Sequence, residues 1–256
     1  MWNRAELKAR AKITLKGVFW IAVLAVVIYA LLTGNTGGNY TANMINQGRN
    51  QMPNNNFPVD PSVKFDFFTR IAAYPLALIL SIIGAFGALI ALLWSLFVAG
   101  PLSVGISRLF LQMKYEKEKF NIKTMFSIFS DSNYMNIVKS VFMTKLIIFL
   151  WTLLFIIPGI IKGYQYHFVP WILAEYPDMD YKTAMAYSKS LTDGQKFQIF
   201  ILELSFLGWL ILGSLLFGLG IPLVSTYEMA TTNELYQVLK GNQNLDASVG
   251  AWTPTV

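Results

Sequence analysis

Long apolar stretches recur along this chain, and they restrict the folds that it can adopt. Residues 18–32 and 71–98 carry no charged side chain, and residues 137–157 and 197–219 carry very few. A helix of about 20 apolar residues is long enough to cross the hydrocarbon core of a bilayer. We therefore predict an all-α, polytopic membrane protein.

The composition supports a membrane location. Of the 256 residues, 55% are hydrophobic and only 13% are charged, whereas soluble domains carry about 25% charged residues. The chain has no cysteine and one histidine, His167. This excludes disulfides and thiolate metal sites, and it argues against histidine-based zinc chemistry. We expect no metal and no cofactor.

The hydrophobic runs predict a single integral membrane domain over residues 1–240 with about six spans. The segment 160–175 is short and follows the Pro158-Gly159 interruption, so it is a kinked span, a re-entrant segment or a surface helix. Residues 34–69 are rich in Asn, Gly and Pro and predict a flexible extracytoplasmic loop, and residues 241–256 predict a disordered cytoplasmic tail. The predicted spans are 17–33, 71–98, 137–157, 160–175, 197–219 and 222–239.

The distribution of basic residues predicts the orientation of the chain. The net charge is +6. In a membrane protein, lysine and arginine held against the anionic lipids of the cytoplasmic leaflet explain such a charge better than nucleic acid does. With both termini inside, residues 1–16 carry five basic residues and residues 99–139 carry six, whereas the outside segments together carry at most four. Both termini are therefore predicted to be cytoplasmic.

Two helices are predicted to lie on the membrane surface. Asn3 with Glu6 three residues later is typical of a capping box, and residues 4–16 combine five basic residues with apolar ones at helical spacing. Asp180 is a suitable N-cap for a second helix over residues 181–192.

The lead-ins to two spans resemble one another. Lys12-Ile-Thr-Leu-Lys-Gly17 stands directly before one span, and Lys189-Ser-Leu-Thr-Asp-Gly194 stands before another. This sequence similarity, an echo of one lead-in by the other, predicts helical hairpins that are each introduced by a surface helix. Between them, Gly100-Pro101 predicts a break after the second span, and residues 102–136 predict surface helices plus a loop.

Three charged residues fall inside apolar segments, where a charge is expensive unless it is paired, hydrated or functional. They are Lys145, Glu203 and Glu234, and the predicted topology places them at similar depth. A Lys145–Glu203 pair with Glu234 nearby is one prediction. The cluster is then a structural clasp between helices, a path for a solute or a proton, or a set of residues in headgroup water.

No catalytic motif is present. The chain lacks HExxH, GxSxG and GxxxxGK[ST]. Catalysis of the Ser-His type would have to centre on His167, which lies in an aromatic segment and is more simply explained as a structural residue. We expect a protein that is not an enzyme.

The stretch from residue 158 to residue 209 resembles an uncharacterised bacterial membrane family known as domain of unknown function 975. The resemblance implies a bacterial plasma-membrane protein without a known activity. The residues that carry it most clearly are Pro158, Gly159, Ser188, Lys189, Gly194, Gly208 and Trp209.

These observations favour a non-enzymatic membrane protein that binds a lipid, peptide or protein partner in envelope maintenance or self-protection. The alternative is a small permease or exporter that uses Lys145, Glu203 and Glu234. The expected partners are anionic lipids of the cytoplasmic leaflet and an unidentified protein or peptide, and no nucleic acid.

Overall fold

The structure is a computed structural model that describes residues 2–33, 66–115, 120–215 and 220–242. Within these ranges the chain is helical and has no strand, which confirms the all-α class. The elements in chain order are α1 (Arg4–Leu15), α2 (Phe19–Thr33), α4 (Asp66–Trp94), the π-helical turn η1 (Ser95–Ala99), α5 (Gly100–Tyr115), α6 (Lys123–Phe126), the 3₁₀ turn η3 (Ser127–Ser130), α7 (Tyr134–Leu154), α8 (Ile156–Gln165), α9 (Val169–Glu175), α10 (Tyr181–Thr192), α11 (Lys196–Leu215) and α12 (Gly220–Asn242).

Helix α5 lies at the centre of the fold. Its side chains Leu102, Ile106, Leu109 and Phe110 are at most 1% exposed, and it packs against α2, α6, α7, α9 and α12. The sequence predicts surface helices here, and for α5 that is wrong. The core accommodates its basic residue because the guanidinium of Arg108 donates to a carboxylate 2.8 Å away and to a backbone carbonyl at 3.3 Å.

The break predicted at Gly100-Pro101 is also wrong. The π-helical turn η1 joins α4 to α5, and Ser81–Met113 forms one long helical stretch. Pro101 stands in the first turn of α5, directly after the widened turn, where a missing N–H costs little. The chain therefore continues from an exposed helix directly into the core.

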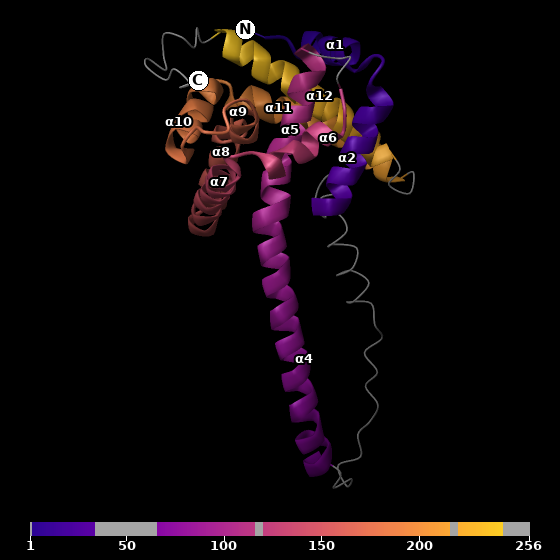
Figure 1. Cartoon of the computed structure of the whole chain (residues 1–256), viewed down its shortest axis with the longest axis vertical. Coiled ribbons are helices and arrows are strands. Elements are labelled where there is room, and N and C mark those ends of the chain that lie inside the picture. The colour runs from indigo at the N-terminus through magenta and orange to yellow at the C-terminus, as the bar shows by residue number, and fades with distance from the viewer. Residues whose placement is uncertain (1, 34–65, 116–119, 216–219, 243–256) are drawn as a thin grey trace.

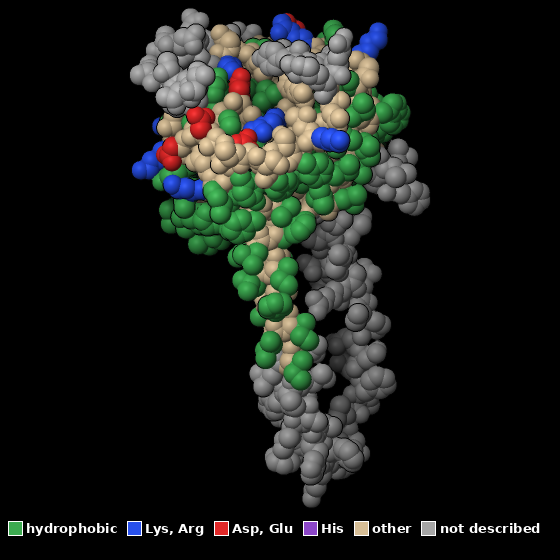
Figure 2. Space-filling view, viewed as in Figure 1, with side chains coloured by type: hydrophobic (Ala, Val, Ile, Leu, Met, Phe, Trp, Pro, Cys, Tyr) green, Lys and Arg blue, Asp and Glu red, His purple; other side chains and the backbone are tan. Residues whose placement is uncertain are grey.

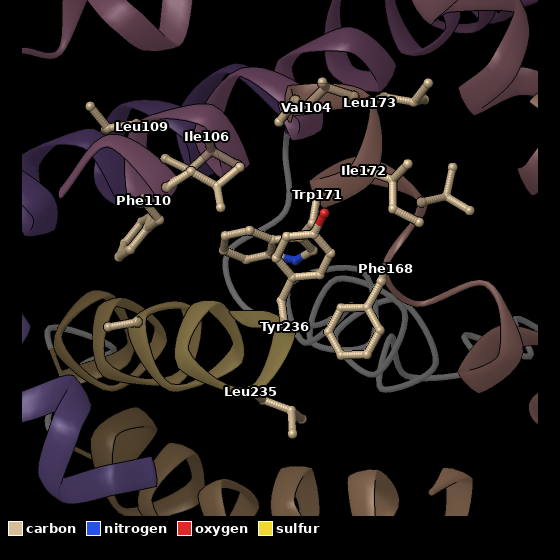
Figure 3. Packing of buried hydrophobic residues seen from close by; sticks show 14 of the residues in the cluster. Val104, Ile106, Leu109, Phe110, Phe168, Trp171, Ile172, Leu173, Leu235 and Tyr236 are labelled. Atoms are coloured by element: carbon tan, nitrogen blue, oxygen red, sulfur yellow. The ribbon is translucent and has the colours of Figure 1, made fainter. Parts of the chain in front are cut away.

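Aromatic side chains join α9 and α12 in this core (Figure 3). The ring of Tyr236 stacks on that of Trp171 with centroids 6.3 Å apart, and it lies 5.8 Å from the ring of Phe168. Tyr236 and Phe168 are fully buried. Such contacts fix α9 against α12, and they position the α8–α9 segment on which part of the candidate site lies.

The charged and the apolar side chains occupy different levels of the molecule. Lysine, arginine and acidic side chains gather at one end, and an apolar band lies below them and continues down α4 (Figure 2). Helix α1 and the C-terminal end of α12 lie at the charged end, whereas α4 extends far beyond the other helices (Figure 1). This arrangement is that of a protein embedded in a bilayer with its charged end at a membrane surface.

Three helical stretches of the described residues are long and apolar enough to cross a membrane, namely Ser81–Met113, Tyr134–Leu154 and Lys196–Ser214. The α1–α2 pair, which is bent by 100°, makes a fourth if it counts as one span. The predicted segment 160–175 forms two short helices, α8 and α9, and α12 is not among these stretches. The number of six spans stays a prediction.

The predicted outer loop and tail fall mostly outside the described residues. Residues 34–65 and 243–256 are not described. The last four residues of the predicted 34–69 loop belong to α4, because that helix begins at Asp66. Residues 241 and 242 still belong to α12 rather than to the predicted tail.

The predicted echo between the two lead-ins has a structural counterpart. Helix α1 ends just before Gly17 and α10 ends just before Gly194, and these two glycines have φ of +95° and +67°. Each left-handed residue turns the chain from a polar helix into an apolar one, α2 or α11, and glycine adopts this conformation without strain.

Candidate functional site

The three intramembrane charges singled out from the sequence do not meet. Glu203 lies on α11, which packs against α8 and α12, whereas Lys145 lies on α7, which packs against α5, α8 and α10. Helix α8 packs against both α7 and α11, and Glu203 is engaged by Tyr164 and His167, so the predicted Lys145–Glu203 pair does not form. The side chain of Lys145 is exposed on α7.

Glu234 belongs to a different interface. Its side chain is 3% exposed and accepts a hydrogen bond of 2.9 Å from the hydroxyl of Thr14. This bond joins α12 to α1, and α1 lies along α12. Glu234 thus holds the N-terminal helix in place rather than completing a cluster with Glu203.

Glu203 forms a polar clasp with the α8–α9 segment. The hydroxyl of Tyr164 donates to its Oε2 at 2.7 Å, and Nδ1 of His167 lies 3.4 Å from its Oε1. The carboxylate of Glu228 on α12 is close enough to interact electrostatically with Glu203. No described group of three or more His, Asp or Glu side chains is placed to hold a metal ion.

The polar face of α12 is satisfied mostly within its own helix. The hydroxyls of Thr226, Thr231 and Thr232 donate to carbonyls one turn earlier in α12. Asn233 instead reaches across to α5, where its Nδ2 donates to the carbonyl of Phe110 at 2.9 Å. These bonds provide helix packing, and they leave the hydroxyls of this face engaged.

A cavity of about 540 Å³ lies where the α1–α2 bend meets the α11–α12 hairpin. This volume falls within the range of roughly 300–1,000 Å³ that is typical of ligand sites. Except for two lysines and the Tyr227 hydroxyl, the side chains that line it are apolar. They are Lys12, Leu15, Lys16, Phe19, Phe206, Trp209, Leu223, Val224 and Tyr227.

Local sequence explains why the cavity forms there. Gly17 turns the chain by its positive φ, so α1 and α2 meet at 100° and do not continue as one rod. Helix α1 packs along α12 and α2 packs against the same helix. The inside of this bend faces α11, where Trp209 is 63% exposed and Phe206 is buried.

The rim of the cavity is positively charged. Lys12 and Lys16 are both exposed, and no acidic side chain of the described residues lines the cavity. The ammonium of Lys12 lies 5.9 Å from the centroid of the Tyr227 ring. Close by, Lys8 lies 4.3 Å from the ring of Phe206 and donates to Ser205 at 2.8 Å. The site therefore offers an apolar interior below a cationic edge.

A second polar cluster closes the charged end of the molecule. Lys240 pairs with Glu175 and donates to the hydroxyl of Tyr176 at 3.1 Å, while the hydroxyl of Tyr236 donates to Glu175 at 2.8 Å. Burial lowers the pKa of Lys240, but its bonds to Glu175 and Tyr176 and the attraction of the Glu175 charge outweigh burial, so the net shift is upward. Burial raises the pKa of the Tyr187 hydroxyl, and the charges of Tyr176 and Glu175 add to this shift. This cluster joins α9 to the end of α12.

The positions that carry the family resemblance mostly have packing roles. A Cβ on Gly159 would lie 2.2 Å from Oγ1 of Thr152, so only glycine allows α8 to approach α7 so closely. The buried Ser188 accepts from the amide of Phe168 and donates to the carbonyl of Gln165, which holds α10 against the α8–α9 turn.

The remaining positions of this set differ in their surroundings. Gly194 supplies the positive φ before α11. Pro158 stands in α8, Lys189 is exposed, and Gly208 has open space around it. Trp209 lines the cavity, and it is the member of the set with a place in the candidate site.

Sequence reasoning found only part of this site. The basic amphipathic pattern of residues 4–16 indicates Lys12 and Lys16, and Trp209 is one of the positions that carry the family resemblance. Leu223 and Val224 could not be distinguished from other apolar residues of a span. No sequence signal indicated that the α1–α2 bend would face the α11–α12 hairpin, because that contact joins the two ends of the chain.

The fold and the site thus define an all-helical, membrane-embedded protein with an apolar cavity at its charged end. The family model described as a protein of unknown function (DUF975) matches residues 153–243, which confirms the resemblance found in the sequence. This match covers α8 to α12 completely, so it contains the Glu203 clasp and one wall of the cavity. Neither the curated proteins nor the solved structures gave a match.

Proposed function

We propose that this chain is a non-enzymatic protein of the bacterial plasma membrane that binds lipid at the cytoplasmic interface, in envelope maintenance or self-protection. Both termini are cytoplasmic in this proposal, because the cytoplasmic face of membrane proteins is enriched in Lys and Arg. The charged end carries α1 and the C-terminal end of α12 (Figure 1).

The cavity between α1, α2, α11 and α12 is the observation that carries the proposal. Its interior is apolar and its volume is about 540 Å³. Such a space, close to the apolar band of the molecule, suits the hydrocarbon part of an amphiphile better than a polar solute. Among the described residues, no group of catalytic side chains is gathered beside this cavity.

A permease or exporter is the less favoured function. It requires Lys145, Glu203 and Glu234 to line one hydrated path. These residues lie on three different helices and face different neighbours. Glu203 and Glu234 accept hydrogen bonds from Tyr164 and Thr14.

Lipid retention tests the proposal. The full chain, expressed in a bacterium and purified in mild detergent, is examined by native mass spectrometry and by extraction of the bound lipid. We expect lipid to remain bound at defined stoichiometry after washing that strips a multi-span control protein. Complete loss of lipid under the same washing overturns the proposed function.

A further inference from the structure

We infer that the cavity is a site for one phospholipid with an anionic headgroup, with its phosphate at Lys12 and Lys16 and one acyl chain in the apolar interior. This inference rests on the proposed function and adds the chemical class of the ligand and the residues that select it.

The position of the headgroup follows from the positive charge of Lys12 and Lys16. Lys12 lies in the last turn of α1 and Lys16 is the C-cap residue of that helix, and both line the cavity, so their ammonium groups can reach the same ligand. Both are exposed, and among the described lining residues there is no acidic side chain that would neutralise them. Lysine binds phosphate as a compact point charge, and a basic residue near the bilayer surface attracts anionic lipid.

The position of the acyl chain follows from the shape and the apolar lining of the cavity. Phe206 and Tyr227 are in contact, with ring centroids 5.5 Å apart, and they form part of the cavity wall together with Trp209 and Leu223. Each CH₂ group buried on such a wall contributes a favourable transfer free energy. Leu223 lies one helical turn before Tyr227 in α12, and the ring beside Lys12 is that of Tyr227, so the cavity extends beyond the lysine rim.

The alternative of a second protein helix in this space is less favourable. A helix with its side chains is about 10 Å across, and a helix-in-groove complex presents several anchor residues along a long groove. The cavity is a pocket inside a bend, with its charge at one edge only, and this shape and polarity match one amphiphile.

Competition between two lipids tests the inference. The full chain is reconstituted in nanodiscs that contain equal amounts of phosphatidylglycerol and phosphatidylcholine with identical acyl chains. It is then released for native mass spectrometry. We expect wild type to retain phosphatidylglycerol preferentially. Lys12→Gln/Lys16→Gln is expected to reduce this preference by on the order of tenfold, since each basic residue near the surface contributes to anionic-lipid binding.

Matched variants separate the site from net charge and from folding. Lys123→Gln/Lys189→Gln removes two exposed lysines elsewhere in the molecule and should leave the preference unchanged. Lys12→Arg/Lys16→Arg keeps the charge and should retain it. Val224→Phe fills the cavity and should reduce retention of both lipids, whereas Ile211→Phe, at an exposed apolar position outside the cavity, should not.

Each contrary result has a distinct meaning. Loss of all lipid from wild type overturns the proposed function and this inference together. Retained lipid without a preference for phosphatidylglycerol overturns only the inference, and so does a preference that survives Lys12→Gln/Lys16→Gln. Normal retention by Val224→Phe also overturns it, because the acyl chain then lies outside the cavity.

Discussion

Glu203 joins α11 to the α8–α9 segment through a hydrogen bond with one well-defined donor. The Tyr164 hydroxyl lies 2.7 Å from the carboxylate, and a hydrogen bond to a charged group contributes about 1.5–3 kcal/mol. We expect Tyr164→Phe to lower the free energy of unfolding in detergent by about that amount. Tyr166→Phe is the matched control, because its ring contact with Lys162 survives the change.

A double-mutant cycle decides whether this loss belongs to the pair. Residues in direct contact show coupling energies of about 0.5–3 kcal/mol, so Tyr164→Phe and Glu203→Gln should be clearly non-additive in thermal unfolding. Additive effects would show that the clasp contributes nothing to stability. Sequence analysis could select Glu203, since a carboxylate in an apolar run is conspicuous. It could not select the partner, because periodicity does not say which helix lies opposite.

Lys240 is a charged residue that stabilises the fold at the charged end of the molecule. Lys240→Gln should lower the free energy of unfolding by about 1–3 kcal/mol at neutral pH, since it leaves the carboxylate of Glu175 without its cationic partner. The pKa of Lys240 is raised in the folded state. Its contribution is therefore fully present below its ordinary pKa of 10.5 and is lost as the pH rises through the higher folded value.

The pH dependence of unfolding checks this sign. The difference between wild type and Lys240→Gln, followed by circular dichroism in detergent, should be constant between pH 7 and 9 and should shrink above pH 10.5. A difference that grows with pH would contradict the assignment. Lys189→Gln, at an exposed lysine, should change stability by less than about 0.5 kcal/mol.

At the scale of helices, the ends of the polar elements follow from short-range chemistry. Asp180 caps α10 by accepting from the amide of Lys182 at 3.2 Å, as the sequence predicts, and α10 has the predicted bounds. Asn3 caps α1 by accepting from the amide of Ala5. The capping box is incomplete, because the carboxylate of Glu6 pairs with Arg10 one turn later.

The backbone strain at the two turns with positive φ can be tested by alanine substitution, because the same substitution inside a helix should have the opposite effect on stability. Gly17 and Gly194 have open space around them, so alanine at either position adds only backbone strain. A left-handed conformation costs a residue with a side chain about 1–2 kcal/mol, and we expect Gly17→Ala and Gly194→Ala each to lower the free energy of unfolding by that amount. Melting temperatures in detergent provide the measurement.

Gly163 is the control for these turns. It also has open space but lies inside α8 with ordinary helical φ, and alanine is favoured over glycine in a helix by about 0.5–1 kcal/mol. Gly163→Ala should therefore be neutral or stabilising. If all three alanines behaved alike, strain at Gly17 and Gly194 would not be what shapes the lead-ins to α2 and α11.

At the scale of the whole molecule, the sequence predicts the elements better than their assembly. Apolar runs and caps locate the helices within a few residues because those signals are local. The burial of α5 and the contact of α1 with α12 depend on packing between distant segments. The pairing of α11 with α8 has the same origin, so hydropathy alone misplaced both the core helix and the partners of Glu203.

The α7–α8 hairpin gives the last test, because it extends much less far than α4 (Figure 1). Helix α8 has ten residues, or about 15 Å at 1.5 Å per residue, which is roughly half of the hydrocarbon core. The tip of the α7–α8 hairpin is formed by Phe155, Ile156 and Ile157, which are apolar and at least 64% exposed. Helix α7 has 21 residues and is long enough to cross, but α8 is too short to return across the bilayer, so we predict that the apolar tip stays in lipid as a re-entrant hairpin.

Cysteine labelling in cells distinguishes this geometry from two complete spans. The chain has no cysteine of its own, so each single substitution reports one position. A membrane-impermeant maleimide should fail to label Ile157→Cys from either side. It should label Asp178→Cys, an exposed position between α9 and α10, only in inverted vesicles. Asn54→Cys, in the loop predicted from sequence to be extracytoplasmic, should react in intact cells. Labelling of Ile157→Cys from outside would mean that α7 crosses the bilayer completely and that the hairpin is two spans.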